Sequence, residues 1–216
     1  MKKAFLLLSG CGVKDGSEIH ESVLCLLALD KLGINVQCIA PDVEQNRTIN
    51  HFTQTPESTS RNALVEGARI ARGNILPLTK ANVEEADMLV IPGGLGAATT
   101  LCTYAADREK ATVLPEVKTI VLSFFENKKP IVATCIAPAI LALCLRDRAN
   151  VTLTLGTNPS DIAWLNEMGM HGSACHSDSF VYDKTYKIAT TPAYMEQTTI
   201  AKISKGIENA IIAASE

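Results

Sequence analysis

A cysteine stands at the join between two apolar runs in the stretch IVATCIAPAIL, residues 131–141. The pattern is typical of a strand that turns directly into a helix. A thiol at such a turn would lie at the positive end of the helix, where free backbone N–H groups and the helix dipole favour thiolate over thiol. Pro138 supports this placement, because proline is tolerated in a first helical turn. Cys135 is therefore a candidate nucleophile; the alternative is an ordinary buried core cysteine.

A nucleophile of this kind needs donors for the negative charge that it creates on a substrate oxygen. The backbone N–H of Ile136, directly after the cysteine, is one candidate. The other is the N–H of Gly94, in the loop VIPGGLG that follows another apolar run. We expect the two amides to form an oxyanion site beside Cys135.

Glu21 is the candidate for proton transfer. It falls in the first turns of the helix predicted after the first strand, next to the apolar Val23 and Leu24. A glutamate turned toward the sheet there would be partly desolvated, which raises its pKa and lets it exchange a proton near neutral pH. The alternative is a solvent-facing glutamate, which is favourable near a helix N-terminus.

Three further residues are candidate pocket residues: Cys11, His20 and His51. Cys11, in the first glycine-rich loop, could be a second ligand, a resolving thiol or a packed turn residue. His20 precedes Glu21, and adjacent helical residues point about 100° apart, so both are not expected to face the thiol. The stretch HGSACH, residues 171–176, lacks the spacing of a zinc site. We expect no metal and no cofactor.

Short apolar runs alternate with helical patterns along the chain, and this alternation would bring the candidate residues together. The expected strands are Phe5–Leu8, Val36–Ala40, Met88–Ile91, Pro130–Thr134, Val151–Leu155 and a pair within Phe180–Ala189. The expected helices are Ser17–Leu32, Val113–Asn127, Pro138–Leu145, Asp161–Met168 and Gln197–Ala214. Apolar strands between helices predict an α/β fold, doubly wound, with a mainly parallel sheet covered on both faces. Ligands bind at the carboxyl ends of such strands, where loops 9–16 and 92–96 and the turn at Cys135 would meet.

Residues 46–80 fit this alternation least well. They contain a helical pattern, RNALVEGARIARG, and a short run, ILPLT, that could be a strand, and we interpret the segment as an insertion. No internal repeat or low-complexity boundary divides the chain, so we expect one domain over residues 1–216.

Composition narrows the class of protein. With 216 residues, a net charge of −3 and scattered lysines and arginines, the chain has no basic footprint for nucleic acid. The seven cysteines are odd in number and form no CxxC pair, which suits a reducing compartment. No run reaches the roughly 18 apolar residues of a membrane helix. We therefore expect a soluble, cytoplasmic protein without a nucleic acid or membrane partner.

Several longer motifs carry a resemblance to a known family. They are SGCGVKDGSEIHESVLCLLAL, APD with INH, RNALVEGARIARGNILPL, VIPGGLGAATTL, CIAPAIL and TTPAYM, and they extend through essentially the whole chain. The sequence resembles the ElbB family, described as glyoxalase-like or isoprenoid biosynthesis proteins with an amidotransferase-like domain, within the ThiJ/PfpI superfamily. The resemblance implies a flavodoxin-like sandwich of the class I glutamine amidotransferase type.

The resemblance also implies site roles and a function. Cys135 would stand at a nucleophile elbow, with Glu21 as the carboxyl beside it and Gly94 and Ile136 as amide donors. The implied activity is a glyoxalase that needs neither glutathione nor metal and converts a small aldehyde substrate, glyoxal, to glycolate; protein deglycation is an alternative account of it. Homodimers are common in the superfamily, and we expect one here.

Two departures from related patterns bear on function. Many superfamily members carry a histidine directly after the nucleophile, where this chain has Ile136. Glutamine amidotransferases of this architecture carry a histidine before the final helix, where this chain reads TTPAYME, so a glutaminase is disfavoured. No GxxxxGK[ST] loop supports direct chemistry on prenyl diphosphates. The alternative function is a redox-sensing or binding protein in which Cys135 is an oxidisable thiol of low pKa.

Overall fold

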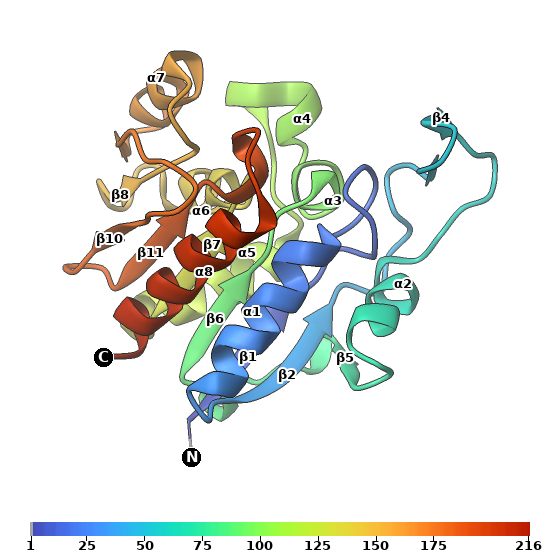
Figure 1. Ribbon diagram of the computed structural model, residues 1–216, viewed down its shortest axis with the longest axis horizontal. Helices are drawn as coiled ribbons and strands as arrows, with labels where there is room; N and C mark the ends of the chain where they lie inside the picture. Colours follow the sequence, from blue (N-terminus) through green and yellow to red (C-terminus); the bar gives the residue numbers. More distant parts are fainter. Residues whose placement is uncertain (1) are drawn as a thin grey trace.

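A seven-stranded sheet forms the centre of the computed structural model, which describes residues 2–216 (Figure 1). The strand order is β10-β11-β7-β6-β1-β2-β5, and every neighbouring pair is parallel except β10 with β11. The seven strands are β1 Lys3–Leu7, β2 Asn35–Ala40, β5 Ile75–Pro77, β6 Met88–Ile91, β7 Ile131–Thr134, β10 Val181–Asp183 and β11 Ile188–Thr191. Two small pairs lie outside this sheet: β3 Ile49–Asn50 with β4 Thr55–Pro56, and β8 Thr152–Leu153 with β9 His171–Gly172.

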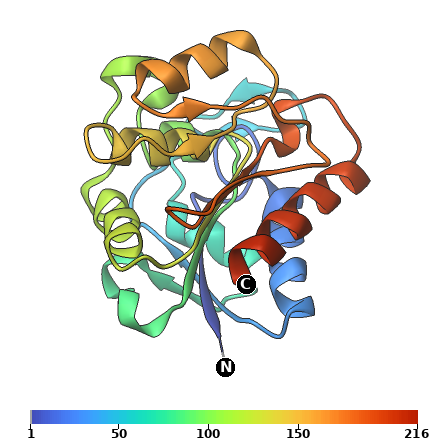
Figure 2. The same ribbon diagram turned by 90° about the vertical axis from the view of Figure 1, so that its left-hand side faces the viewer.

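Helices cover both faces of the sheet. They are α1 Ile19–Lys31, α2 Ala63–Ile70, α3 Leu95–Thr99, α4 Tyr104–Asp107, α5 Pro115–Glu126, α6 Pro138–Leu145, α7 Pro159–Glu167 and α8 Ile200–Ser215. Short 3-10 turns occupy Leu78–Lys80, Val83–Glu85, Arg108–Lys110 and Ala193–Met195. Figure 2 shows α1 and α8 on one side of the sheet and α5 on the other. The predicted doubly wound α/β fold is confirmed.

Alternation along β1 explains why this strand lies at the centre. Phe5 and Leu7 enter one buried cluster, together with Phe124 of α5, and Ala4 and Leu6 enter a second cluster on the opposite face. Successive side chains of a strand point to opposite faces, so the four consecutive apolar residues Ala4–Leu7 must be covered on both. The Phe5 and Phe124 rings meet edge to face at 6.2 Å between centroids.

Two sequence-based expectations need correction. The strand expected at Val151–Leu155 shrinks to Thr152–Leu153 and lies outside the main sheet, because β11 takes the place beside β7. The segment 46–80 is an insertion only in part. Its end supplies β5, which pairs parallel with β2 and completes one edge of the sheet. The run ILPLT, which could be a strand from its sequence, therefore does form one, and Pro77 lies at its end, where proline is tolerated.

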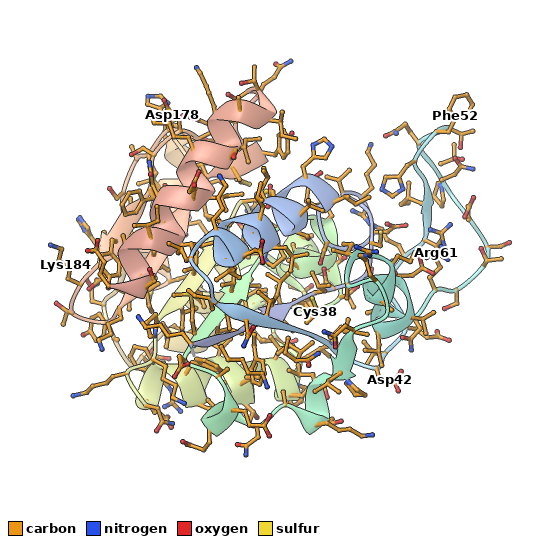
Figure 3. The ribbon with its side chains drawn as sticks, turned by 60° about the horizontal axis from the view of Figure 1, so that its bottom comes forward. Cys38, Asp42, Phe52, Arg61, Asp178 and Lys184 are labelled. Atoms are coloured by element: carbon orange, nitrogen blue, oxygen red, sulfur yellow. The ribbon has the colours of Figure 1, made fainter. Side chains whose placement is uncertain are left out.

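The packing of Phe124 generates a prediction about stability. Phe124 is fully buried, so Phe124→Ala should lower the free energy of unfolding by about 3–5 kcal/mol through lost burial and the cavity left behind. Urea denaturation measures the change. Phe52, in the turn between β3 and β4, projects into solvent (Figure 3) and is 95% exposed. Phe52→Ala is the matched control and should stay within about 0.5 kcal/mol of wild type; equal losses in both variants would contradict the assigned core.

Candidate active site

Cys135 occupies a strained turn between β7 and α6. It follows Thr134 directly, and its φ of +56° places it in the left-handed region that non-glycine residues seldom adopt. Its backbone N–H donates to the carbonyl oxygen of Thr191 at 2.9 Å, which ties the turn to the end of β11. The residue is 8% exposed. Strain of this kind persists only where the surroundings hold it, and it concentrates at functional sites.

Glu21 is wholly buried beside the cysteine, near the start of α1. Its Oε2 accepts hydrogen bonds from the Gly93 N–H at 2.9 Å and from the Thr134 hydroxyl at 2.7 Å. Its Oε1 accepts a longer one, 3.4 Å, from the N–H of Tyr194. The carboxyl is also hydrogen-bonded to the Cys135 thiol. Donors from three separate chain segments therefore hold one carboxyl against the thiol.

Backbone contacts between two glycine-rich loops build this arrangement. The Glu18 N–H donates to the Gly93 carbonyl at 2.9 Å, and the Gly96 N–H donates to the Gly16 carbonyl at the same distance. Gly94 has a φ of +95°, and a Cβ there would lie 2.3 Å from the Glu18 nitrogen. Only glycine allows so close an approach, and the approach brings the β6 loop against the start of α1.

Burial dominates the titration of both groups. It raises the pKa of Glu21 to about 7, although the hydrogen bonds from Thr134 and Gly93 oppose the shift. Burial, and then the charge and hydrogen bond of Glu21, raise the pKa of the Cys135 thiol well above its usual range. Hydrogen bonds from the amides of Gly94 and Ile136 lower it only in part. The low thiol pKa expected from the helix dipole is therefore wrong, because desolvation and the neighbouring carboxylate outweigh the dipole.

The candidate residues divide into two groups. The structure brings Cys135, Glu21, Gly94 and Ile136 together, with both amides on the thiol. His20, by contrast, is exposed, and its Nδ1 lies 2.8 Å from the hydroxyl oxygen of Tyr194.

The other two candidate pocket residues belong to the surroundings of the first loop. His51 packs on that loop: its Nε2 accepts from the Lys14 N–H at 3.2 Å, and its Nδ1 pairs with the Ile49 carbonyl. Cys11 is partly exposed, and its thiol pKa is raised by burial and then by the charge of Glu66.

Sequence reasoning missed three residues that contact Glu21. Thr134 and Gly93 supply its two shorter hydrogen bonds, and Tyr194 supplies the longer one. Thr134 had a signal: a hydroxyl directly before the candidate nucleophile, in a run that is otherwise apolar. No sequence signal marked Tyr194, because its contact with Glu21 comes from its backbone and depends on how the turn before α8 folds.

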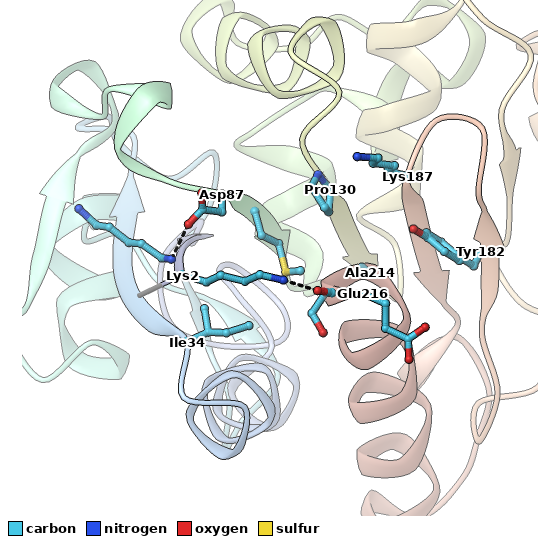
Figure 4. A pocket seen from close by; sticks show the side chains of 11 residues that line it. Lys2, Ile34, Asp87, Pro130, Tyr182, Lys187, Ala214 and Glu216 are labelled. Carbon is cyan, nitrogen blue, oxygen red and sulfur yellow. Dashed lines mark hydrogen bonds between the residues drawn. The ribbon is translucent and has the colours of Figure 1, made fainter.

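A pocket at the opposite end of the sheet does not belong to this site. It has a volume of about 260 Å³ and is lined by Lys2, Asp87, Pro130, Tyr182 and Lys187 among others (Figure 4). Lys2, Asp87 and Pro130 directly precede β1, β6 and β7, whereas Cys135 follows the carboxyl end of β7. Among residues 2–216, no group of three or more His, Cys, Asp or Glu side chains is arranged to hold a metal ion. Over the same residues, every helix is too short or too polar to span a bilayer.

A parallel α/β sheet with a cysteine elbow and a buried glutamate defines a class of protein, and comparison with known proteins agrees with it. A family model described as the DJ-1/PfpI family matches residues 11–152. The chain belongs to the DJ-1/PfpI family.

A solved isoprenoid biosynthesis protein with an amidotransferase-like domain from Ehrlichia chaffeensis is 37% identical, with a TM-score of 0.94, over 100% of this chain and 98% of that one. The ElbB-type resemblance is thus confirmed. Drosophila melanogaster DJ-1beta shares the fold, with 18% identity and a TM-score of 0.58 over 100% and 91% of the two chains.

Curated relatives correct one expectation. The human glutamine amidotransferase-like class 1 domain-containing protein 3, mitochondrial, is 38% identical over 94% of this chain and 78% of its own length. The rat ES1 protein homolog, mitochondrial, is 39% identical over 94% and 79%. Both relatives bear mitochondrial names, so the expectation of a cytoplasmic protein, which rested on composition and cysteine usage, is contradicted.

The raised pKa of Glu21 predicts how stability depends on pH. The folded protein holds this proton more tightly than the unfolded chain, whose glutamate titrates near its ordinary value of 4.5. The stabilising contribution is complete below pH 4.5 and is lost as pH rises through about 7, by about 3 kcal/mol. The Glu21→Gln variant has no carboxyl to titrate at this position. Between about pH 5 and 8, the free energy of unfolding of wild type should therefore fall relative to that of this variant. Urea denaturation across that range measures the difference.

A matched control is Glu167→Gln, which replaces an exposed carboxyl near the end of α7. The free energy of unfolding of this variant should vary with pH in parallel with that of wild type over the same range. A wild-type curve parallel to Glu21→Gln would show that Glu21 does not carry a raised pKa.

Proposed function

We propose that this protein is a glutathione-independent glyoxalase-like enzyme that converts small 2-oxoaldehydes, glyoxal to glycolate, through Cys135. One observation carries the proposal: a buried thiol and a buried carboxyl share a hydrogen bond, and the pKa of the carboxyl is about 7. A carboxyl with this pKa can accept and return a proton near neutral pH, which is what an isomerisation between adjacent carbons requires.

In the first step, sulfur attacks one aldehyde carbon of the substrate. The high pKa of the thiol disfavours a free thiolate, so the Cys135 proton passes to the Glu21 carboxylate as the carbon–sulfur bond forms. The product is a hemithioacetal. Its oxyanion is the former aldehyde oxygen, on the carbon bonded to sulfur, within reach of the amides of Gly94 and Ile136, which already hydrogen-bond the thiol.

In the second step, the hemithioacetal becomes a thioester. Glu21 first returns the thiol proton to the oxyanion, which becomes a hydroxyl, and its carboxylate then removes the hydrogen from the carbon attached to sulfur. The hydroxyl proton on that carbon moves to the neighbouring carbonyl oxygen, and Glu21 delivers its proton to the neighbouring carbon. The carbon beside sulfur is then a thioester carbonyl, and the neighbouring carbon carries an alcohol. Water then cleaves the thioester to the 2-hydroxy acid and restores the thiol. The sum is one 2-oxoaldehyde and one water to one 2-hydroxy acid, with no external oxidant or reductant. Deglycation would begin from the same attack, on an aldehyde-derived adduct of a protein.

A substitution at the nucleophile tests the proposal. Cys135→Ser should reduce glycolate formation from glyoxal, without glutathione, by at least about a thousandfold, because removal of a covalent nucleophile removes the reaction path. The measurement is chromatographic quantification of the 2-hydroxy acid. Cys144→Ala, a buried cysteine of the helix that follows Cys135, is the control and should retain turnover. Full activity in Cys135→Ser would exclude the scheme.

The same assay distinguishes the proposed enzyme from the second candidate function, a redox sensor. A sensor would react rapidly with peroxide and show negligible turnover of glyoxal. The burial of Cys135 and its raised pKa disfavour this function, because peroxide oxidises exposed thiols of low pKa.

We further propose that the enzyme is a homodimer that uses the exposed face of α1. Ile19, Val23 and Leu27 are spaced by four residues, so they share one side of the helix, and they are 43%, 48% and 45% exposed. Val23→Glu should convert the dimer to a monomer in sedimentation velocity, because the new charge would be desolvated at the interface. Val65→Glu, at an exposed apolar position of α2, should leave the assembly unchanged. A wild-type monomer would contradict the proposal.

A further inference from the structure

One residue outside the proposed catalytic group contacts the site at two points. The backbone N–H of Tyr194 lies 3.4 Å from Oε1 of Glu21, and the Tyr194 hydroxyl lies 2.8 Å from Nδ1 of His20. His20 and Glu21 are adjacent on α1, so the start of this helix holds both ends of the same tyrosine. The two rings also lie against each other, with 5.8 Å between centroids.

Tyr194 belongs to a turn, Pro192–Met195, whose backbone is strained. Ala193 has a φ of +45°, in the left-handed region that an alanine seldom adopts. The following residue, Glu196, accepts hydrogen bonds from the Thr157 hydroxyl at 2.8 Å and from the Ser177 N–H at 2.9 Å. The turn is therefore held at Glu196, at the Ala193 carbonyl, which accepts from the Ser177 hydroxyl at 2.6 Å, and at Tyr194 by the bond to His20. Strained backbone persists because its surroundings hold it, so each contact that is lost favours relaxation.

The Pro192–Met195 turn also lies close to Cys135. Thr191, directly before it, accepts the Cys135 N–H, and Ala193 shares a buried apolar cluster with Cys135. Ile136, Tyr194 and Met195 pack against that cluster. Cys135 is 8% exposed, so its environment leaves little room for a substrate to approach the sulfur.

We propose that the hydrogen bond between His20 and Tyr194 is a latch that holds the Pro192–Met195 turn closed over Cys135, and that both residues are positioning residues of the site. The proposal rests on the role of Cys135 as the reactive group. Closing the turn places the Tyr194 N–H on Glu21 and excludes water from the carboxyl. Opening it exposes the thiol and removes one donor from the carboxyl at the same time. Substrate access and the proton affinity of Glu21 are therefore coupled through one turn.

The test measures how fast iodoacetamide alkylates Cys135, followed by mass spectrometry of the peptide that carries it. It needs no turnover of glyoxal, so it is independent of whether the proposed reaction is correct. Tyr194→Phe removes the hydroxyl and keeps the backbone N–H, and His20→Ala removes the partner. Each should speed alkylation roughly fivefold, the population shift expected when one hydrogen bond is lost. The double variant should match the single ones, because both changes break the same bond.

Two sets of controls distinguish opening of the latch from a general loss of stability. Cys25, buried in the middle of α1, reports global opening in the same sample and should stay at the wild-type rate. Tyr186→Phe and His171→Ala remove a tyrosine hydroxyl and an imidazole elsewhere and should leave Cys135 unchanged. An unchanged rate at Cys135 in Tyr194→Phe would overturn the proposal. An equal rise at Cys25 and Cys135, or additive effects in the double variant, would overturn it as well.

Discussion

The hydrogen-bonded pair of Cys135 and Glu21 is the constraint on which the rest of the site depends. A carboxyl with no exposed surface is costly unless its oxygens are satisfied, and here the donors come from Gly93, Thr134 and Tyr194. These residues follow β6, end β7 and precede α8, while Glu21 itself lies on the helix after β1. The order of strands in the sheet, with β1, β6 and β7 side by side, is what allows one carboxyl to reach all of these donors.

Cys135 and Glu21 also affect each other's pKa. The carboxyl raises the pKa of the thiol by its charge and by accepting the thiol's hydrogen bond, and burial raises the pKa of both groups. At neutral pH the thiol is therefore neutral and the carboxyl about half ionised. In the proposed reaction, the proton moves over one hydrogen bond as sulfur attacks. Glu21 would then take the part of the histidine that many superfamily members carry after the nucleophile, where this chain has Ile136.

The sequence predicted the fold and indicated that the candidate residues Cys135, Glu21, Gly94 and Ile136 lie together, because both depend on local patterns. The run before Cys135, Pro138 after it and the glycines at 93 and 94 mark a strand, a helix and a tight loop without further information. The run ILPLT indicated the edge strand β5, Ile75–Pro77, only as a possible strand, because three residues are too few for periodicity to decide. Two features were not predicted. The direction of the Cys135 pKa depends on burial, which spacing alone does not give. The contact from Tyr194 depends on the strained Ala193, and no residue type announces a positive φ there.

The placement of β1 at the centre of the sheet has a consequence for how the protein is made. Glu21 leaves the ribosome early, but its partners at residues 93, 134 and 194 follow much later in the chain. Chain synthesis at about 5–20 residues per second leaves the carboxyl hydrated and charged for several seconds before any donor can cover it. The Pro192–Met195 turn, part of which packs in the same cluster as Cys135, also follows it late in the chain, so the thiol is synthesised well before residues that help to bury it. A nascent chain therefore carries a hydrated cysteine that the folded protein buries.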